Sequence, residues 1–290
     1  SVGVITTSGS LGILIPPSIV MIIYAVSTSE SAGKLFIAGI VPGILLAALL
    51  MLVTYVSARK RNFPTLPRAS GREIWDSFKD AFWGLMLVVI VMGGIYGGIF
   101  TPTEAAAVSA VYAFIAAVFI YRGLKLRAVP KVLLSAANTS AMLLYIITNA
   151  ILFSFLLTSE QIPQVLAHWV VDQQLSPWMF LMAINVALLV AGQFMEPSSI
   201  ILILAPLLVP IAKTMGIDPI HLGVIMTVNM EIGMIHPPVG LNLFVASHIA
   251  KMGLTEVSIA CLPWVFVLLA YLILITYVPA LTLWLPNLLY

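Results

Sequence analysis

The chain has 290 residues, of which 61% are hydrophobic and only 8% are charged. Soluble domains are about a quarter charged, so this composition excludes a soluble globular protein and predicts an all-α integral membrane protein. The formal net charge of +2 gives no reason to expect a nucleic-acid partner. The single cysteine, Cys261, lies in an apolar run and excludes an internal disulfide.

Runs of roughly 17–25 apolar residues mark the expected membrane segments, and none alternates polar and apolar residues as a barrel strand would. About nine such segments follow one another along the chain. They cover residues 2–28, 34–57, 82–100, 103–121, 132–157, 177–193, 197–213, 219–249 and 257–279. We expect the first and the eighth of them to be broken helices.

The two segments expected to be broken contain near-copies of one motif. Gly12–Pro17 reads Gly-Ile-Leu-Ile-Pro-Pro, and Gly233–Pro238 reads Gly-Met-Ile-His-Pro-Pro. A proline pair removes two N–H donors and forces the preceding residues out of the α region, so neither segment can continue as one helix. Broken backbone inside a bilayer survives only within protein or beside a polar cavity, and paired broken helices are typical of secondary transporters.

Basic residues set the expected orientation, because cytoplasmic loops are enriched in Lys and Arg. One basic stretch covers residues 59–79 and another covers residues 122–131, with two membrane segments between them. Both stretches can therefore lie on the cytoplasmic side. The first broken helix then runs outward, whereas the second runs inward toward Lys251, as in an inverted repeat.

Parts of the chain deviate from simple membrane spans. Segments 177–193 and 197–213 are short and flank a polar stretch, so we predict a re-entrant hairpin; two ordinary spans with a polar loop are the alternative. Within residues 59–80, Ile74 and Phe78 stand at helical spacing among charged residues. This pattern predicts an amphipathic helix over 72–82 in the membrane interface, unless the stretch is plain loop.

An interrupted helix leaves backbone carbonyl oxygens unpaired, and such oxygens are ligands for hard cations. Because no carboxylates cluster at either motif, we expect Na⁺ rather than a divalent ion. A structural kink without a bound ion is the alternative. The expected oxygen donors are Gly12, Ile15 and Pro17 at the first interruption, and Gly192, Gly233, His236 and Val239 at the second.

The half-helices that follow the proline pairs begin with free N–H groups and with the positive ends of helix dipoles. These groups suit the carboxylate of a small organic substrate, and hydroxyl or amide donors stand next to them. The expected substrate-binding residues are therefore Pro17 and Ser18 at the first interruption, and Pro238 and Asn242 at the second.

Several ionisable residues in apolar surroundings allow more than one interpretation. Glu196 and Glu231 are candidates for proton coupling, since charged groups inside a membrane are usually functional. Glu196 could instead cap the helix that starts at Pro197, and Glu231 could pair with a polar neighbour. His236 either makes its site sensitive to pH or is a satisfied buried side chain, and His221 is expected at the membrane interface.

Five motifs, in order along the whole chain, resemble the large membrane subunit of TRAP transporters, the tripartite ATP-independent periplasmic transporters. The motifs are Gly9–Ser18, Gly97–Ala107, Met195–Pro197, Gly233–Asn242 and Leu283–Asn287. The resemblance implies a multi-pass protein of the bacterial inner membrane that imports an organic acid by a Na⁺-driven elevator mechanism, with sodium held at the residues named above. It also implies two partners, a small membrane subunit and a periplasmic substrate-binding protein that delivers the acid.

Two features depart from that family. His236 stands where the family commonly has threonine, and little sequence precedes the first motif, so we expect an N-terminal part to be absent from this chain. We expect residues 1–33 and 176–252 to form the transport domain, and scaffold segments or further membrane helices to make up the rest. The expected divisions are 1–33, 34–80, 81–130, 131–175, 176–252 and 253–290.

We expect no enzymatic activity, because the sequence contains no nucleophile elbow, phosphate loop or metal-spaced Cys/His set. Two alternatives to an importer that depends on a binding protein remain. A stand-alone Na⁺/dicarboxylate symporter would transport without a binding protein, and a channel would pass substrate downhill without Na⁺, whereas a non-transporting membrane scaffold would pass none. The acid stays open between C4-dicarboxylate, sialic acid, keto acid and uronate.

Overall fold

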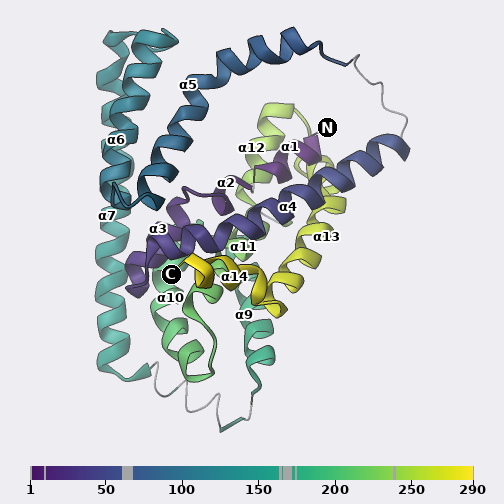
Figure 1. Ribbon diagram of the computed structural model, residues 1–290. Helices are drawn as coiled ribbons and strands as arrows, with labels where there is room; N and C mark the ends of the chain where they lie inside the picture. The colour runs from purple at the N-terminus through teal and green to yellow at the C-terminus, as the bar shows by residue number, and fades with distance from the viewer. Residues whose placement is uncertain are drawn as a thin grey trace. The chain divides into compact units, whose positions relative to one another are not determined.

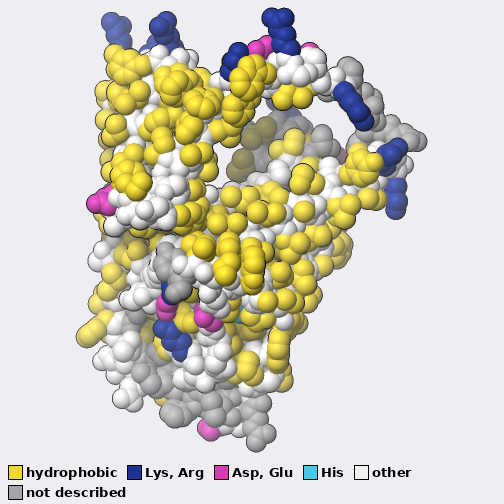
Figure 2. All heavy atoms as spheres, viewed as in Figure 1, with side chains coloured by type: hydrophobic (Ala, Val, Ile, Leu, Met, Phe, Trp, Pro, Cys, Tyr) yellow, Lys and Arg dark blue, Asp and Glu magenta, His cyan; other side chains and the backbone are white. Residues whose placement is uncertain are grey.

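The structure is a computed structural model that describes residues 2–9, 11–60, 68–162, 165, 172–173, 175–237 and 240–289. All regular secondary structure in these ranges is helical, which confirms the predicted class (Figure 1). Seven helical segments there are long and apolar enough to cross a membrane. Figure 2 shows hydrophobic side chains over most of the visible face, as expected for a protein surrounded by lipid.

The chain divides into two compact units. The first unit contains Ser1–Lys60 and Ile146–Tyr290, and the second contains Arg61–Tyr145. Both predicted broken helices belong to the first unit, so the interruptions and their surroundings are described within it.

The first broken helix is interrupted twice. A turn separates α1 (Val2–Ser8) from α2 (Leu11–Leu14), and the proline pair separates α2 from α3 (Ile19–Thr28). Ser18 caps α3, because its hydroxyl accepts the backbone N–H of Met21 at 3.4 Å. The interruption at the proline pair is confirmed, and the earlier break between α1 and α2 was not predicted.

The second broken helix consists of α11 (Pro219–Ile235) and α12 (Leu241–Ala250), with its interruption where the motif predicts it. Every residue of α11 except Pro219 and Met234 is buried. A helix that is buried around its whole circumference lies in a core. It packs against α3 and five further helices: α4 (Ala32–Lys60), α9 (Pro177–Gly192), α10 (Pro197–Thr214), α13 (Leu254–Tyr277) and α14 (Ala280–Leu289).

The two broken helices run antiparallel. α1 packs beside α12, and α3 packs beside α11, so the first half of each helix lies against the second half of the other. A parallel pair would bring the two first halves together instead. Figure 1 shows the N-terminus and α12 at the same end of this pair. The arrangement agrees with the inverted orientation predicted from the basic loops.

The two short segments between α7 (Val129–Ser159) and α11 are also helical. α9 packs closely along α11, whereas α10 (Pro197–Thr214) packs against both α11 and α3. Residues 193–196 form the turn that joins them. This turn lies beside the second interruption, where the carbonyl of Gln193 accepts a hydrogen bond from the backbone N–H of Gly240. A re-entrant path of this pair through the bilayer stays a prediction.

Further helices of the first unit pack around α11. α4 packs against α13 and α14, and the Tyr271 hydroxyl of α13 donates to the carbonyl oxygen of Pro42 in α4 at 2.6 Å. α14 was not predicted, because the proline at 286 lies within its ten residues. Proline normally ends a helix, but a helix this short and packed on α4 keeps its shape through its contacts.

The second unit is built around α5 (Gly71–Tyr96) and α6 (Pro102–Ile115), which pack on each other. The predicted helix over 72–82 is the first part of α5, one continuous helix that curves along its length (Figure 1), and its place in the membrane interface stays a prediction. No proline stands between the amphipathic and the apolar stretch, and the lone Gly84 is tolerated within a helix. Thr101 and Glu104 cap α6 reciprocally.

Candidate functional site

The structure brings the end of α9 against the second interruption. A Cβ atom built on Gly233 would lie 2.7 Å from the Cα of Gly192 and 2.8 Å from its carbonyl carbon. Real Cβ contacts essentially never fall under 3.0 Å, so this approach requires glycine at 233. The backbone N–H of Gly240 also donates to the carbonyl of Gln193 at 3.3 Å. Two residues predicted to share one site, Gly192 and Gly233, are therefore in direct contact.

Carbonyl oxygens converge within the second interruption. A Cβ built on Gly240 would lie 2.9 Å from the carbonyl oxygen of Met234 and 3.0 Å from that of His236. Gly240 also has a φ of +54°, which favours glycine. Two backbone oxygens thus point at the place that a side chain at 240 would fill. The sequence motif predicted His236 as an oxygen donor but gave no signal for Met234.

The other predicted residues of the second interruption are placed only in part. Pro238 and Val239 lie outside the described residues. The backbone of His236 has left the helical conformation, and its N–H donates to the carbonyl of Gly233 at 3.3 Å. The ring Nδ1 of His236 lies 2.5 Å from the carbonyl oxygen of Pro237, so the side chain is engaged with its own backbone. This contact favours the interpretation of a satisfied histidine.

The first interruption is more open. No atom comes within 4 Å of a Cβ built on Gly12, and Ile15 is 41% exposed. Pro17 is exposed as well, whereas Ser18 is buried beneath it as the cap of α3. The carbonyl oxygen of Leu14 faces α4, 2.8 Å from a Cβ built on Gly39. Gly12, Ile15 and Pro17 are therefore exposed residues, although α4 approaches Ile15, where a Cβ built on Gly43 would lie 2.9 Å from its Cγ1 atom.

A cavity links the two interruptions. It has a volume of about 520 Å³, lies between α1 and α12, and is lined mainly by apolar side chains. Ile13 borders it from the first interruption, and Met234 borders it from the second. Asn242 and Thr6 contribute polar side chains to its wall. Asn242, a predicted substrate-binding residue, thus faces a space that both interruptions reach.

A buried polar network holds α11 in place. The amide of Asn229 donates to the Oδ1 of Asn185 in α9 at 2.7 Å, and the amide of Asn185 donates to the hydroxyl of Thr276 in α13 at 2.9 Å. His221 lies 2.7 Å from the hydroxyl of Thr282 in α14 and is only 2% exposed. The unpredicted α14 covers His221, and the position of this histidine relative to the membrane interface stays a prediction.

The two glutamates behave differently. Glu196 caps α10: its carboxylate accepts the backbone N–H of Ser199 at 3.3 Å and the hydroxyl of Ser198 at 2.6 Å. The capping interpretation is therefore confirmed. Glu231 is 1% exposed, and neither of its carboxylate oxygens has a hydrogen-bond partner among the described residues. The backbone N–H groups of Ile13 and Leu14 lie beside this carboxyl group, so an interaction of Glu231 with a polar neighbour stays a prediction.

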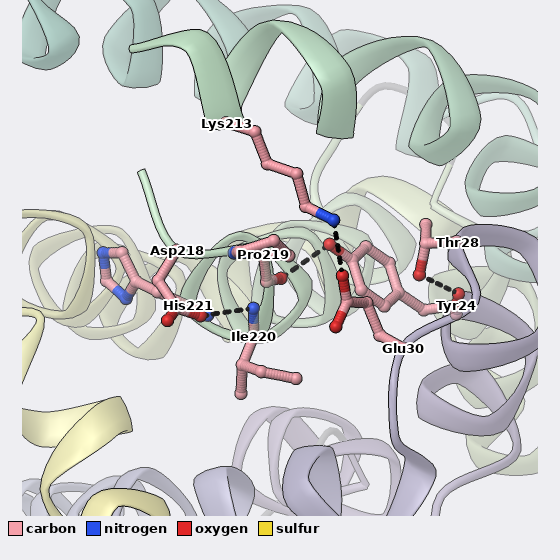
Figure 3. A network of polar contacts seen from close by, with 8 residues as sticks. All are labelled: Tyr24, Thr28, Glu30, Lys213, Asp218, Pro219, Ile220 and His221. Carbon is pink, nitrogen blue, oxygen red and sulfur yellow. Dashed lines mark hydrogen bonds and ion pairs between the residues drawn. The ribbon is translucent and has the colours of Figure 1, made fainter. Parts of the chain in front are cut away.

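A polar cluster joins the far ends of the antiparallel pair (Figure 3). The Tyr24 hydroxyl donates to the carbonyl oxygen of Pro219 at 2.6 Å, which ties α3 to the start of α11. The Lys213 ammonium at the end of α10 lies 2.9 Å from a Glu30 carboxylate oxygen just after α3. Asp218 caps α11 by accepting the N–H of Ile220 at 2.7 Å. These contacts anchor the helices without involving the interruptions.

Comparison with known proteins gives consistent matches. Residues 1–281 match the family described as "Tripartite ATP-independent periplasmic transporter, DctM component". The chain is 61% identical to the C4-dicarboxylate TRAP transporter large permease protein DctM of Rhodobacter capsulatus, over 99% of this chain and 68% of that protein. The corresponding Pseudomonas aeruginosa permease is 58% identical, over 98% and 67%. The sialic acid TRAP transporter large permease SiaM of Vibrio cholerae is 39% identical, over 99% and 67%.

Proposed function

The chain belongs to the DctM family, the large permeases of tripartite ATP-independent periplasmic transporters, and we propose that it imports C4-dicarboxylates driven by a sodium gradient. Its relatives are permease subunits, not enzymes. The relatives named for C4-dicarboxylates are 61%, 58% and 50% identical to the chain. The relatives named for sialic acid are 39% and 37% identical. This difference supports a C4-dicarboxylate as the substrate.

Sodium binding at the second interruption carries the proposal. The supporting observation is the contact of Gly192 with Gly233, beside two carbonyl oxygens that converge on Gly240. Na⁺ is a hard cation that prefers oxygen ligands, and backbone carbonyls freed from a helix supply them without a fixed negative charge. The first interruption offers the equivalent backbone oxygens of Gly12, Ile15 and Pro17 on the antiparallel helix.

The substrate binds where both interruptions border one space. The cavity between α1 and α12 reaches Ile13, Met234 and Asn242. The half-helix that begins at Leu241 directs its positive end toward the preceding interruption, which favours a carboxylate there. Bound sodium offsets the charge of a dianion inside the membrane. We assign Ser18 and Pro17 to the entry of this space from the first interruption.

Transport proceeds by an elevator-type movement in the inner membrane. α11 and its interruption move together with α3, α9 and α10, because the far-end cluster and the buried network tie these helices to one another. The remaining helices brace against a small membrane subunit. A periplasmic binding protein delivers the substrate, and α9 with α10 forms the re-entrant hairpin whose turn closes on the sodium site.

Reconstitution into proteoliposomes tests the proposal. The permease is combined with a small TRAP subunit and a C4-dicarboxylate-binding protein, and uptake of radiolabelled succinate is measured under an imposed Na⁺ gradient. We expect uptake only when Na⁺ and the binding protein are both present, and sialic acid should not compete. The control replaces Na⁺ by K⁺ at equal ionic strength and membrane potential.

The same assay separates the alternatives. Full uptake without a binding protein would identify a stand-alone symporter. Downhill flux without Na⁺ would identify a channel, and no flux under any condition with a correctly folded complex would leave a membrane scaffold. Each of these results contradicts the proposal in a different step.

A further inference from the structure

Among the described residues of the first unit, Glu231 is the buried side chain with two oxygen atoms that lack a hydrogen-bond partner. Its side chain is 1% exposed, and both carboxylate oxygens are buried without a hydrogen-bond partner in the described part of the chain. Transfer of a carboxylate into such surroundings is costly unless the charge is paired. None of the ion pairs between described residues involves Glu231. The carboxylate therefore lacks a charged partner among the described residues.

The surroundings of the Glu231 carboxyl group indicate where a charged partner would lie. Its carboxyl group lies beside the backbone N–H groups of Ile13 and Leu14, in the short helix between the two breaks of the first broken helix. Two residues further along α11, Gly233 contacts the end of α9. One turn of α11 thus touches the hairpin on one side and the first interruption on another.

The neighbouring groups leave the carboxylate oxygens free for a cation. Tyr271 is close to Glu231, but its hydroxyl donates to the carbonyl of Pro42 at 2.6 Å. A carboxylate has about four lone-pair sites on its two oxygens, so proximity to backbone N–H groups does not exhaust them. Gly12 and Ile15 are exposed residues of the same motif, and their carbonyl groups are the uncharged oxygen donors predicted there.

We propose that Glu231 supplies the carboxylate ligand of a sodium ion held at the first interruption, so that this ion joins the two broken helices. The proposal rests on the sodium-driven transport proposed above and adds to it the one anionic ligand of the site. A sodium ion at this place pairs the buried charge and bridges the repeats. Sodium at the first interruption consequently depends on a residue of the second broken helix.

Substitution of Glu231 tests the assignment through sodium binding rather than transport. Purified permease complex in detergent is heated in NaCl or in choline chloride, and the rise in Tm is titrated with Na⁺. Glu231→Gln keeps the shape and removes the charge, so we expect half-saturation to need at least tenfold more Na⁺. Glu231→Asp keeps the charge and should lose no more than about threefold. If Glu231→Asp weakens Na⁺ binding as much as Glu231→Gln, the loss does not come from the missing charge, and the assignment is overturned.

Thr227→Val is the matched control. Thr227 is buried on the same helix, and its hydroxyl donates only within α11, to the carbonyl of Gly223 at 2.8 Å. The control should leave the Na⁺ titration unchanged. A Glu231→Gln protein that binds Na⁺ as tightly as wild type overturns the assignment, while Na⁺-driven uptake by wild type would still uphold the proposed function. A wild-type protein that ignores Na⁺ contradicts both.

A second measurement applies if Glu231→Gln is not recovered folded. Infrared difference spectra of the wild type and of Glu231→Asp are recorded on exchanging K⁺ for Na⁺. Ligation by a carboxylate predicts a sodium-induced change in the carboxylate stretching band of the wild type that shifts in the Asp variant. Identical spectra from the two proteins overturn the assignment.

Discussion

The two interruptions share a sequence motif but differ in how tightly they are packed. At the second, Gly233 touches the backbone of Gly192, and Gly240 is enclosed by carbonyl oxygens. At the first, Gly12 faces open space and Ile15 is partly exposed. The motif itself only breaks the helix, and the neighbouring segment decides how closely other backbone can approach. At the second interruption that segment is the turn between α9 and α10.

Replacing a glycine by alanine at each interruption should give the largest difference between the two. Gly233→Ala places a Cβ within 2.8 Å of two backbone atoms of Gly192, which cannot move aside as a side chain could. We expect Na⁺-driven uptake to fall at least tenfold more than with Gly12→Ala, whose Cβ meets no atom within 4 Å. Uptake in proteoliposomes, normalised to the amount of folded permease, measures both. Equal losses would show that packing does not distinguish the interruptions.

A second pair of glycines separates packing from backbone conformation. Gly240 and Gly216 both have positive φ, +54° and +73°, but only Gly240 is enclosed. Alanine in this conformation costs roughly 1–2 kcal/mol at either position. We expect Gly240→Ala to lower the Tm clearly more than Gly216→Ala, because its Cβ also displaces two carbonyl oxygens. Similar shifts would contradict the enclosed geometry of the second interruption.

The far-end cluster sharpens the comparison, because it shows that the open first interruption is anchored elsewhere. Tyr24→Phe removes the partly buried hydrogen bond of 2.6 Å from α3 to the Pro219 carbonyl. We expect a loss of about 1 kcal/mol in the free energy of unfolding. Tyr277→Phe is the control, since its hydroxyl makes an exposed contact of 3.3 Å. Chemical denaturation in mixed micelles compares the two.

The smallest effect is expected from the ion pair between Lys213 and Glu30. The ammonium side chain is 54% exposed, so solvent screens much of the attraction. A double-mutant cycle with Lys213→Met and Glu30→Gln should give a coupling energy of about 0.2–1 kcal/mol. High salt should reduce this coupling, whereas the contribution of Tyr24 should stay the same. A coupling that exceeds that of Tyr24 would reverse the proposed order of the anchors.

The sequence predicted those features that depend on local chemistry. Proline pairs break helices in any surroundings, so both interruptions lie where the motif placed them. The cap at Glu196 follows from its position before Pro197. Gly192 and Gly233 were predicted as oxygen donors of one site, and the structure places them in contact.

Other features depend on contacts that a single sequence does not display. The burial of His221 follows from α14, whose internal proline hid it as a helix. The carbonyl of Met234 joins the second interruption only because Gly240 folds back toward it. Glu231 reaches the first interruption because the repeats are antiparallel and adjacent, and no spacing along the chain encodes that distance.

The complete enclosure of α11 has a consequence for how the protein is made. This helix has 17 residues, is not among those long and apolar enough to cross a membrane by themselves, and carries Asn229 and Glu231 near its middle. Partitioning into lipid as a separate segment is unfavourable for such a sequence. We therefore expect the translocon to release α11 only together with α9 and α3, so that biogenesis of this part is a joint event.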